Sequence, residues 1–213
     1  MLAVLTEADR RELLQLARRR RFARGEVIFH EGDPGDTMHL VAQGHVAVRA
    51  TTPLGDVAML RVLRPGEFFG ELAVVSPGPR NATVVALDRV ETLGIGKQQL
   101  DELRSRRPAV DALITEALVN EIRRLAAALT EALYVPSEKR LLHRLVELTA
   151  RFGTDANPAT VIPLTQDELA QLAGVTRPTA NRILKKAEED GTMRISRGKV
   201  EILDAAALAR QAR

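Results

Sequence analysis

The sequence predicts an α+β protein with a strand-rich front segment, one long helix and a C-terminal helix-turn-helix. Three observations carry this prediction. Short β-branched runs broken by glycine and proline fill residues 27–96, a helical pattern without internal glycine or proline fills residues 108–134, and two helix starts lie close together in residues 164–186. We expect three domains: residues 1–107, residues 108–135 and residues 136–213.

Residues 164–186, LTQDELAQLAGVTRPTANRILKK, carry the start and stop signals of two short helices. Thr165 and Glu168 have the spacing of a capping box, and Thr176 followed by Pro178 is typical of an N-cap with an early proline. Gly174 lies between them, where a sharp turn favours a residue without a β-carbon. The pattern therefore predicts a helix-turn-helix.

The second helix of this motif would present a polar and basic face. Such a face fits a DNA major groove, where arginine can bond guanine with two hydrogen bonds. The alternative is an ordinary helical hairpin with a solvated basic face. A two-stranded ribbon over residues 193–203 follows, and it is either a wing that touches the DNA backbone or a surface hairpin. The candidate DNA-binding residues are Thr165, Thr176, Arg177, Thr179, Asn181, Arg182, Lys185, Lys186, Arg197 and Lys199.

Composition and charge narrow the class of protein. The net charge of +3 lies wholly in residues 135–213, which is the direction expected if this end meets phosphate. The chain has no cysteine, which excludes disulfides and thiolate metal sites, and only 3% aromatic residues, which argues against a single-strand nucleic-acid binder. No apolar run is long enough for a membrane span and no signal-peptide pattern is present, so we expect a cytoplasmic protein.

The front segment reads as many short strands at regular spacing, which predicts a small antiparallel barrel or sandwich. A helix over Thr6–Arg19 is expected before it. The basic run Arg18–Arg21, with Arg24, is interpreted as a solvated face between that helix and the first strand at Val27.

The long helix, Pro108 to Tyr134, carries two apolar edges. Residues spaced as a heptad seam form one edge, and a second edge at Val110, Leu113 and Ala117 would pack on the barrel. A stripe this wide suits a core as well as a dimer interface, but helix-turn-helix proteins usually bind DNA as two-fold dimers. We expect a hinge at Pro136-Ser137-Glu138 and a further helix over Arg140–Phe152. The candidate dimer-interface residues are Leu118, Ile122, Leu125, Leu129 and Ala132.

This order of elements resembles the bacterial catabolite activator protein family, the cyclic AMP receptor and fumarate–nitrate regulators. The front segment contains Phe69-Gly70-Glu71-Leu72-Ala73 and then Pro79-Arg80-Asn81-Ala82-Thr83, which resemble the family's cyclic-nucleotide cassette. The resemblance implies a cyclic-nucleotide-binding jelly-roll barrel, a long dimerisation helix and a winged helix-turn-helix. The effector-binding residues it implies are Gly70, Glu71, Leu72, Ala73, Arg80, Asn81, Ala82 and Thr130.

The chemistry of these residues suits a cyclic phosphodiester. Such a ligand needs a cation, free N–H groups at a helix start and an acceptor for the sugar, which Arg80, the turn at Gly70 and Glu71 would supply. The alternative is an arginine–glutamate pair that only joins two strands. We expect cyclic AMP or cyclic GMP as the effector, and no required cofactor.

Three departures from the family pattern bear on ligand and operator. Asn81 stands where cyclic AMP binders commonly have serine or threonine, although its amide can still donate. Leu125 and Ala126 fall near the family's adenine contacts, which leaves Thr130 as a substitute. In the second helix of the helix-turn-helix, here called the reading helix, Arg177 and Arg182 match arginines of the family pattern, whereas Pro178 replaces a glutamate. We therefore expect a related but relaxed or shifted operator.

We therefore expect a homodimeric transcription regulator, not an enzyme, that binds double-stranded DNA at two-fold half-sites and works with RNA polymerase. One alternative is an effector-independent regulator with a relict or retuned pocket. Another is a nucleotide-sensing module that regulates a partner protein. Several potential metal ligands lack a recognisable spacing, so a solvated surface is favoured and no metal is expected; they are His30, Glu31, Asp33, His39 and His45.

Overall fold

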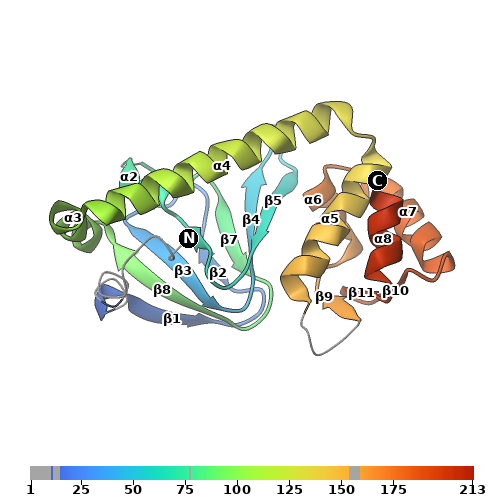
Figure 1. The fold of residues 1–213 in the computed structure, drawn as a ribbon, viewed down its shortest axis with the longest axis horizontal. Helices are drawn as coiled ribbons and strands as arrows, with labels where there is room; N and C mark the ends of the chain where they lie inside the picture. The colour runs from blue at the N-terminus through green and yellow to red at the C-terminus, as the bar shows by residue number, and fades with distance from the viewer. Residues whose placement is uncertain (1–10, 12–14, 77, 154–158) are drawn as a thin grey trace. The chain divides into compact units, whose positions relative to one another are not determined.

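The computed structural model describes residues 11, 15–76, 78–153 and 159–213, and the chain divides into two compact units (Figure 1). The first unit is Met1–Ala50 with Val62–Ala127, and the second is Thr51–Arg61 with Ala128–Arg213. Most of the helix expected at Thr6–Arg19 lies outside the described residues. No helix in the described part of the chain is long and apolar enough to cross a membrane.

Two four-stranded sheets form the front of the chain, as the regular strand spacing predicted. One sheet has the order β1-β8-β3-β6, from β1 (Arg18–Phe22), β8 (Val90–Gly96), β3 (Thr37–Gln43) and β6 (Phe68–Phe69). The other has the order β2-β7-β4-β5, from β2 (Val27–Phe29), β7 (Thr83–Ala86), β4 (Val46–Thr51) and β5 (Val57–Leu63). The pairs of β8 with β1 and β3, and of β7 with β2 and β4, are antiparallel.

Arg18–Arg21 are exposed, as expected for a solvated face, but they form strand β1 and do not precede the first strand, so that part of the interpretation was wrong. Arg19 and Arg21 both donate to Glu91 on β8, and the guanidinium of Arg20 lies over the ring of Phe22 at 5.1 Å. Phe22 is buried. Ion pairs to the neighbouring strand thus stabilise this strand. Its sequence lacks the alternation of apolar and polar residues by which strands are usually predicted.

A first core cluster joins the barrel to the helices that follow it. Buried side chains of β3 and β8 pack with α3 (Lys97–Arg106) and the start of α4 (Pro108–Tyr134). Val110 and Leu113 are among them, as predicted for the second edge of the long helix, whereas Ala117 is half-buried and Ile114 joins the cluster in its place. The sequence reading did not include α3, and α4 has the predicted bounds.

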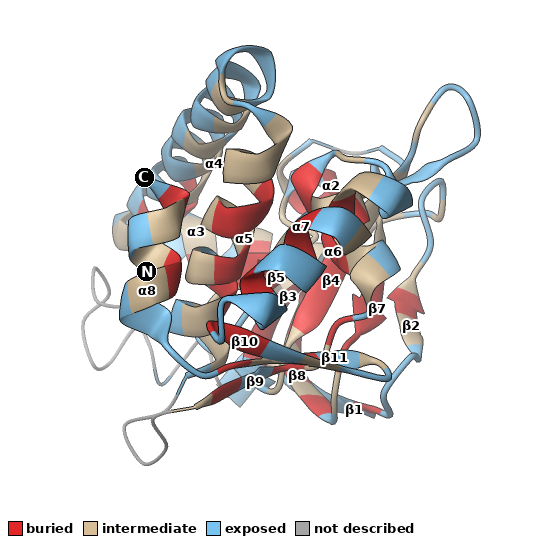
Figure 2. Ribbon diagram, turned by 90° about the vertical axis from the view of Figure 1, so that its right-hand side faces the viewer, coloured by how far each residue is buried: buried red, intermediate tan, exposed pale blue. Residues whose placement is uncertain are grey.

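The described part of the second unit contains four helices besides the end of α4. They are α5 (Ser137–Phe152), α6 (Gln166–Ala173), α7 (Arg177–Glu189) and α8 (Ala205–Ala212), with a sheet of order β10-β11-β9 from β9 (Thr160–Ile162), β10 (Met193–Ser196) and β11 (Lys199–Ile202). The ribbon was predicted, whereas its third strand and α8 were not. Figure 2 shows buried residues alternating with half-buried ones along α5 and with exposed ones along α7.

The expected hinge is shorter than predicted. Ser137 and Glu138 already belong to α5, and Pro136 occupies its N-cap position with an extended backbone. Proline tolerates the position because a helix start lacks a partner for its N–H group, and an acidic residue in the first turn favours the helix.

Gly174 ends α6 in the left-handed conformation, with φ +61° and ψ 43°. A β-carbon there would meet no atom within 4 Å, so backbone strain alone opposes substitution. We expect Gly174→Ala to lower the free energy of unfolding by about 1 kcal/mol. Thermal unfolding checks this, with Gly174→Asn as the control, since asparagine tolerates this conformation and should lose less. Equal losses in both variants would contradict the assignment.

Candidate effector pocket and nucleic-acid interface

Arg80 lies buried at the centre of the candidate effector site, with 6% of its surface exposed. Its Nη1 donates to the carbonyl of Gly70 at 3.0 Å and its Nη2 to the carbonyl of Thr37 at 2.6 Å. Its Nε is buried and has no hydrogen-bond partner in the described part of the chain. The barrel therefore holds the two terminal nitrogens by main-chain acceptors and leaves the buried Nε without a partner in the residues that the structure describes.

Two glycines make room for this guanidinium. Gly70 has φ +77°, and a β-carbon on it would lie 2.6 Å from Nη1 of Arg80. A β-carbon on Gly35 would lie 2.3 Å from that of Ala73 and 3.1 Å from Nε of Arg80. Glycine at both positions is thus a condition for burying the arginine next to the FGELA turn.

The FGELA turn leads into a short helix, α2 (Leu72–Val75). Glu71 is at its N-cap position, half-buried, and its carbonyl accepts from the N–H groups of Val74 and Val75. The side chain of Ala73 is buried and that of Leu72 is exposed. The structure therefore brings the turn and Arg80 together, as the sequence motif predicts.

Burial and nearby carboxylates act on the pKa of Arg80 in opposite directions. Burial lowers the pKa of the guanidinium, and the carboxylates of Asp36, Asp33 and Glu71 oppose that shift. A cation in such a place attracts an anionic ligand, provided that the ligand compensates for the loss of water.

The remaining expected effector residues differ from one another in burial and in the unit to which they belong. Ala82 is buried and Asn81 is exposed. Thr130 is exposed on α4, within the second compact unit.

An aromatic group supports Arg80, and the sequence reading missed it. The guanidinium lies 4.1 Å from the ring centroid of Phe29, which is tilted against Phe69 at 5.8 Å. The ring of His39 stacks on Phe69 at 5.1 Å, and its Nδ1 lies 3.2 Å from the hydroxyl of Thr92. Phe29 comes from β2 of one sheet, whereas His39 and Phe69 come from the paired strands β3 and β6 of the other, so no local pattern marks these rings.

A large open cavity lies beside this site and not in it. It has a volume of about 1040 Å³ and is lined by residues of β1, β8 and α3, and by Asp36 and Thr37 at the start of β3. Among the candidate effector residues none lines it. Because the motif residues expected to hold the effector lie elsewhere, we place the candidate site at Arg80.

The potential metal ligands singled out in the sequence are dispersed. His30 is exposed, His39 is buried, and Nδ1 of His45 lies 2.7 Å from a carboxylate oxygen of Asp88. In the described part of the chain, no three histidine or acidic side chains gather in a way that could hold a metal ion.

The helix-turn-helix has the caps that its sequence predicts. The hydroxyl of Thr165 accepts from the N–H of Glu168 at 3.1 Å, while the Glu168 carboxylate accepts from the N–H of Thr165 at 2.8 Å. Thr176 caps α7 by accepting from the N–H of Thr179 at 3.4 Å. These bonds fix where α7 begins and hence which of its side chains face outward.

The outward face of α7 is basic. Arg177, Arg182, Lys185 and Lys186 are exposed, as is Thr176. Thr179 and Asn181 are less exposed than these residues, because both are half-buried. Oδ1 of Asn181 is covered, so Asn181 lies at the edge of this face. Arg197 and Lys199 are exposed at the turn of the β10–β11 ribbon.

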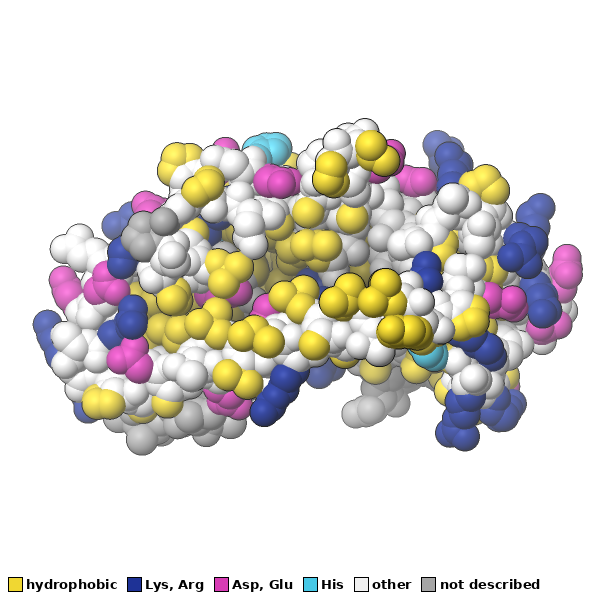
Figure 3. All heavy atoms as spheres, turned by 90° about the horizontal axis from the view of Figure 1, so that it is seen from above, with side chains coloured by type: hydrophobic (Ala, Val, Ile, Leu, Met, Phe, Trp, Pro, Cys, Tyr) yellow, Lys and Arg dark blue, Asp and Glu magenta, His cyan; other side chains and the backbone are white. Residues whose placement is uncertain are grey.

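Helix α4 leaves much of its heptad seam uncovered. Ile122, Leu125 and Leu129 are 65%, 50% and 61% exposed, and Ala132 is exposed as well. Leu118 instead packs partly on the first core cluster. Figure 3 shows the hydrophobic side chains as a band along α4. Leu133 and Tyr134 extend the exposed set, which the heptad count did not include.

Comparison with protein families assigns both halves of the chain. Residues 19–107 match the cyclic nucleotide-binding domain and residues 139–211 match the Crp-like helix-turn-helix domain. A CRP-like cAMP-activated global transcriptional regulator of Mycobacterium tuberculosis is 31% identical over 194 residues, 90% of this chain and 87% of that protein. The chain belongs to the Crp family of transcription regulators.

Other members of the Crp family are similar over the same length. The cyclic AMP receptor protein of Thermus thermophilus is 32% identical over 195 residues, 92% of this chain and 88% of that protein. A crystal structure of a CRP/FNR-family regulator from the same organism superposes with a TM-score of 0.77 at 25% identity, covering 92% of this chain and 98% of that chain. The family fold, a nucleotide-binding barrel followed by a DNA-binding helix-turn-helix, is thereby confirmed.

His39 gives this Crp-family barrel a measurable response to acid. Burial, with a smaller contribution from the charge of Arg80, lowers the pKa of His39 from 6.5 to about 4. The unfolded chain therefore takes up a proton before the folded chain does, and stability present above pH 6.5 is lost as the pH falls towards 4. Between these limits we expect His39 to account for a loss of about 3 kcal/mol.

Thermal unfolding between pH 7 and pH 4.5 tests this expectation. His39→Gln should have a shallower acid loss than the wild type. The matched control is His30→Gln, because His30 is exposed, and it should retain the wild-type slope. If the His39 variant kept the full slope, other groups would account for the acid loss.

Proposed function

We propose that this Crp-family regulator is a homodimer whose DNA binding is controlled by a cyclic nucleotide held at Arg80 in the barrel. Cyclic AMP is the preferred effector, because the full-length relatives are described as cAMP-activated or as a cyclic AMP receptor. RNA polymerase would be its partner in transcription. The observation that carries the proposal is the buried guanidinium at the FGELA turn of a cyclic nucleotide-binding domain.

The roles of the site residues follow from their chemistry. Arg80 would pair with the cyclic phosphate, since a guanidinium offers several donors in a fixed fork. Glu71, half-buried beside it, would accept from the ribose hydroxyl. Asn81 would donate from its amide where relatives use a hydroxyl, and Thr130 on α4 would serve the base.

A second candidate is a regulator of the same family that needs no effector. It is favoured by two features of Arg80 and its neighbour. Both terminal nitrogens of Arg80 already donate to main-chain carbonyls, and Asn81 is exposed. An arginine held in this way can stabilise the barrel without a ligand.

The dimer proposal rests on the uncovered seam of α4. Ile122, Leu125 and Leu129 form an apolar row that a second copy of the helix would cover. In a two-fold dimer, the two α7 helices would enter successive major grooves, whose centres lie about 34 Å apart. Effector and DNA would then raise each other's affinity by the same factor.

Calorimetric titration with cyclic AMP, and then cyclic GMP, tests the effector. We expect one site per subunit with micromolar affinity, and a loss of at least about tenfold in both Arg80→Ala and Arg80→Lys, because lysine lacks the fork. Arg89→Ala, which removes an exposed arginine of the same unit, should bind as the wild type does.

The outcomes separate the two candidates. Absence of binding by the wild-type protein to either nucleotide, with an unchanged melting temperature, would reject the effector proposal in favour of the effector-independent regulator. DNA binding by the same preparation would show that this outcome does not come from a misfolded sample.

Base recognition by α7 is tested on duplexes selected from random sequence by the wild-type protein. Arg177→Ala should cost about 1–3 kcal/mol on the best site and relax the preference at one position, whereas Lys185→Ala should weaken all sequences alike and lower the salt slope by about 1. Arg194→Ala is the control, because Arg194 pairs with Glu201 within the ribbon. A uniform loss in Arg177→Ala would make Arg177 a backbone contact.

A further inference from the structure

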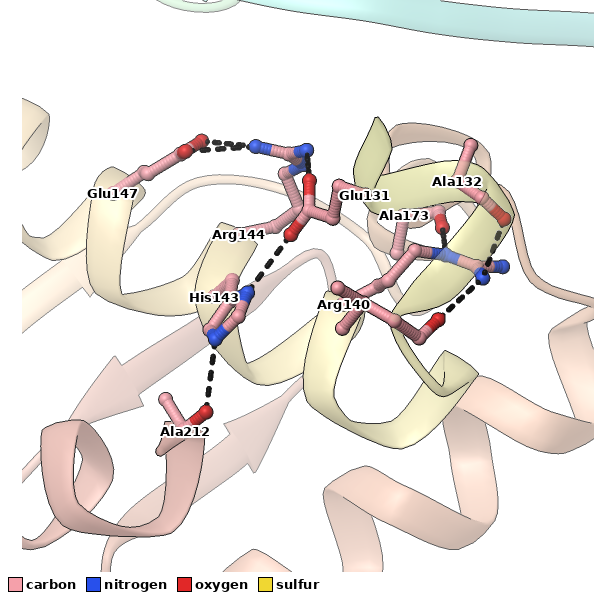
Figure 4. Close-up of polar contacts among 9 residues, drawn as sticks. Glu131, Ala132, Arg140, His143, Arg144, Glu147, Ala173 and Ala212 are labelled. Atoms are coloured by element: carbon pink, nitrogen blue, oxygen red, sulfur yellow. Dashed lines mark hydrogen bonds and ion pairs between the residues drawn. The ribbon is translucent and has the colours of Figure 1, made fainter. Parts of the chain in front are cut away.

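Arg140 contacts two helix ends at once (Figure 4). Its Nη1 donates to the carbonyl of Val135 at 3.0 Å and lies 3.5 Å from that of Ala132, at the end of α4. Its Nε donates to the carbonyl of Ala173 at 3.1 Å and its Nη2 to that of Gly174 at 3.0 Å, at the end of α6. All four acceptors are main-chain carbonyls where a helix has run out of its own donors.

The arrangement suits a guanidinium and no other side chain. Helix C-termini carry partial negative charge, so a cation between two of them is favourable. The planar fork of arginine can direct donors to both ends together, whereas the three donors of lysine radiate from a single atom. Arg140 thus joins the last turn of α4 to the turn that precedes the reading helix α7.

A second set of contacts fixes the same turn of α4. The carboxylate of Glu131, whose side chain is 14% exposed, accepts from Nδ1 of His143 at 2.8 Å and from Arg144, both on α5. Nε2 of His143 lies 2.8 Å from the carbonyl of Ala212 in α8. Figure 4 shows Glu131 between the two α5 side chains.

The division of the chain agrees with these contacts. Ala128–Arg213 falls in the second compact unit, together with Thr51–Arg61, so the last turns of α4 group with the helix-turn-helix. Polar contacts therefore join the end of α4 to α5 and α6, in addition to the covalent connection through Val135 and Pro136.

We propose that Arg140 is a positioning residue for DNA binding, which holds the reading helix α7 at a fixed orientation to the end of the dimerisation helix. This inference rests on the proposed dimer, because a fixed orientation matters only where two reading helices must meet two half-sites. Arg140 need not touch DNA for this role. It determines how well the two helices of a dimer match the spacing of an operator.

The test compares the wild type with Arg140→Lys on three duplexes. These are the operator selected by the wild-type protein, its isolated half-site, and the operator with one base pair inserted between the half-sites. We expect Arg140→Lys to weaken binding to the full operator by at least about tenfold, to leave half-site binding unchanged, and to reduce the penalty of the inserted base pair. Glu131→Gln should change these affinities in the same direction.

Arg123→Lys is the matched control, since Arg123 is exposed on α4 and the change is chemically the same. It should bind all three duplexes as the wild type does. An equal loss on operator and half-site would overturn the proposal, because Arg140 would then only stabilise the helix-turn-helix. Unchanged operator binding by Arg140→Lys would overturn it too.

Sedimentation of the same proteins separates this proposal from the dimer on which it rests. A wild-type protein that is monomeric, and that binds operator and half-site with equal affinity, would reject the dimer. A dimeric wild type with unaltered spacing preference in Arg140→Lys would reject only the role of Arg140.

Discussion

Burying the charge of Arg80 constrains the whole front unit. A guanidinium removed from water costs several kcal/mol unless its donors are used, and the barrel meets this cost with two main-chain carbonyls and the face of Phe29. The glycines at positions 35 and 70 are consequences of the same requirement, because a β-carbon at either would collide with the group or its neighbours. His39 stacks on Phe69, which in turn contacts Phe29, so its ring lies near Arg80. The charge of Arg80 would repel a second cation there, which favours the neutral form of His39.

The second unit depends instead on how its helix ends are satisfied. Thr165 and Thr176 cap the starts of α6 and α7, Gly174 turns the chain between them, and Arg140 takes the carbonyls at the ends of α4 and α6. Each device removes unpaired backbone groups from a junction. These contacts consequently fix the angles between neighbouring helices. They therefore also fix the direction in which the exposed face of α7 points.

Sequence signals were sufficient wherever the physics is local. The capping box at Thr165, the turn at Gly174 and the bounds of α4 all depend on residues a few positions apart. Strand β1 was missed because its stability comes from Glu91, far along the chain, and the arginines themselves carry no apolar alternation. The aromatic layer under Arg80 and the contacts of Arg140 were missed for the same reason, since each joins separate elements. The seam of α4 was ambiguous because Leu118 packs on the barrel while Ile122, one turn later, is exposed.

The boundary of the second unit within α4 has a practical consequence for modular design. Regulators of this architecture invite exchange of their sensing halves, and the interdomain linker at Pro136 is the obvious place to join two proteins. A junction there would separate Glu131 from His143 and Arg144, and the carbonyls at the end of α4 from Arg140. A chimaera joined before Ala128 would instead keep the native acceptors with their donors. The segment that keeps these polar contacts therefore begins inside a continuous helix and not at the break that follows it.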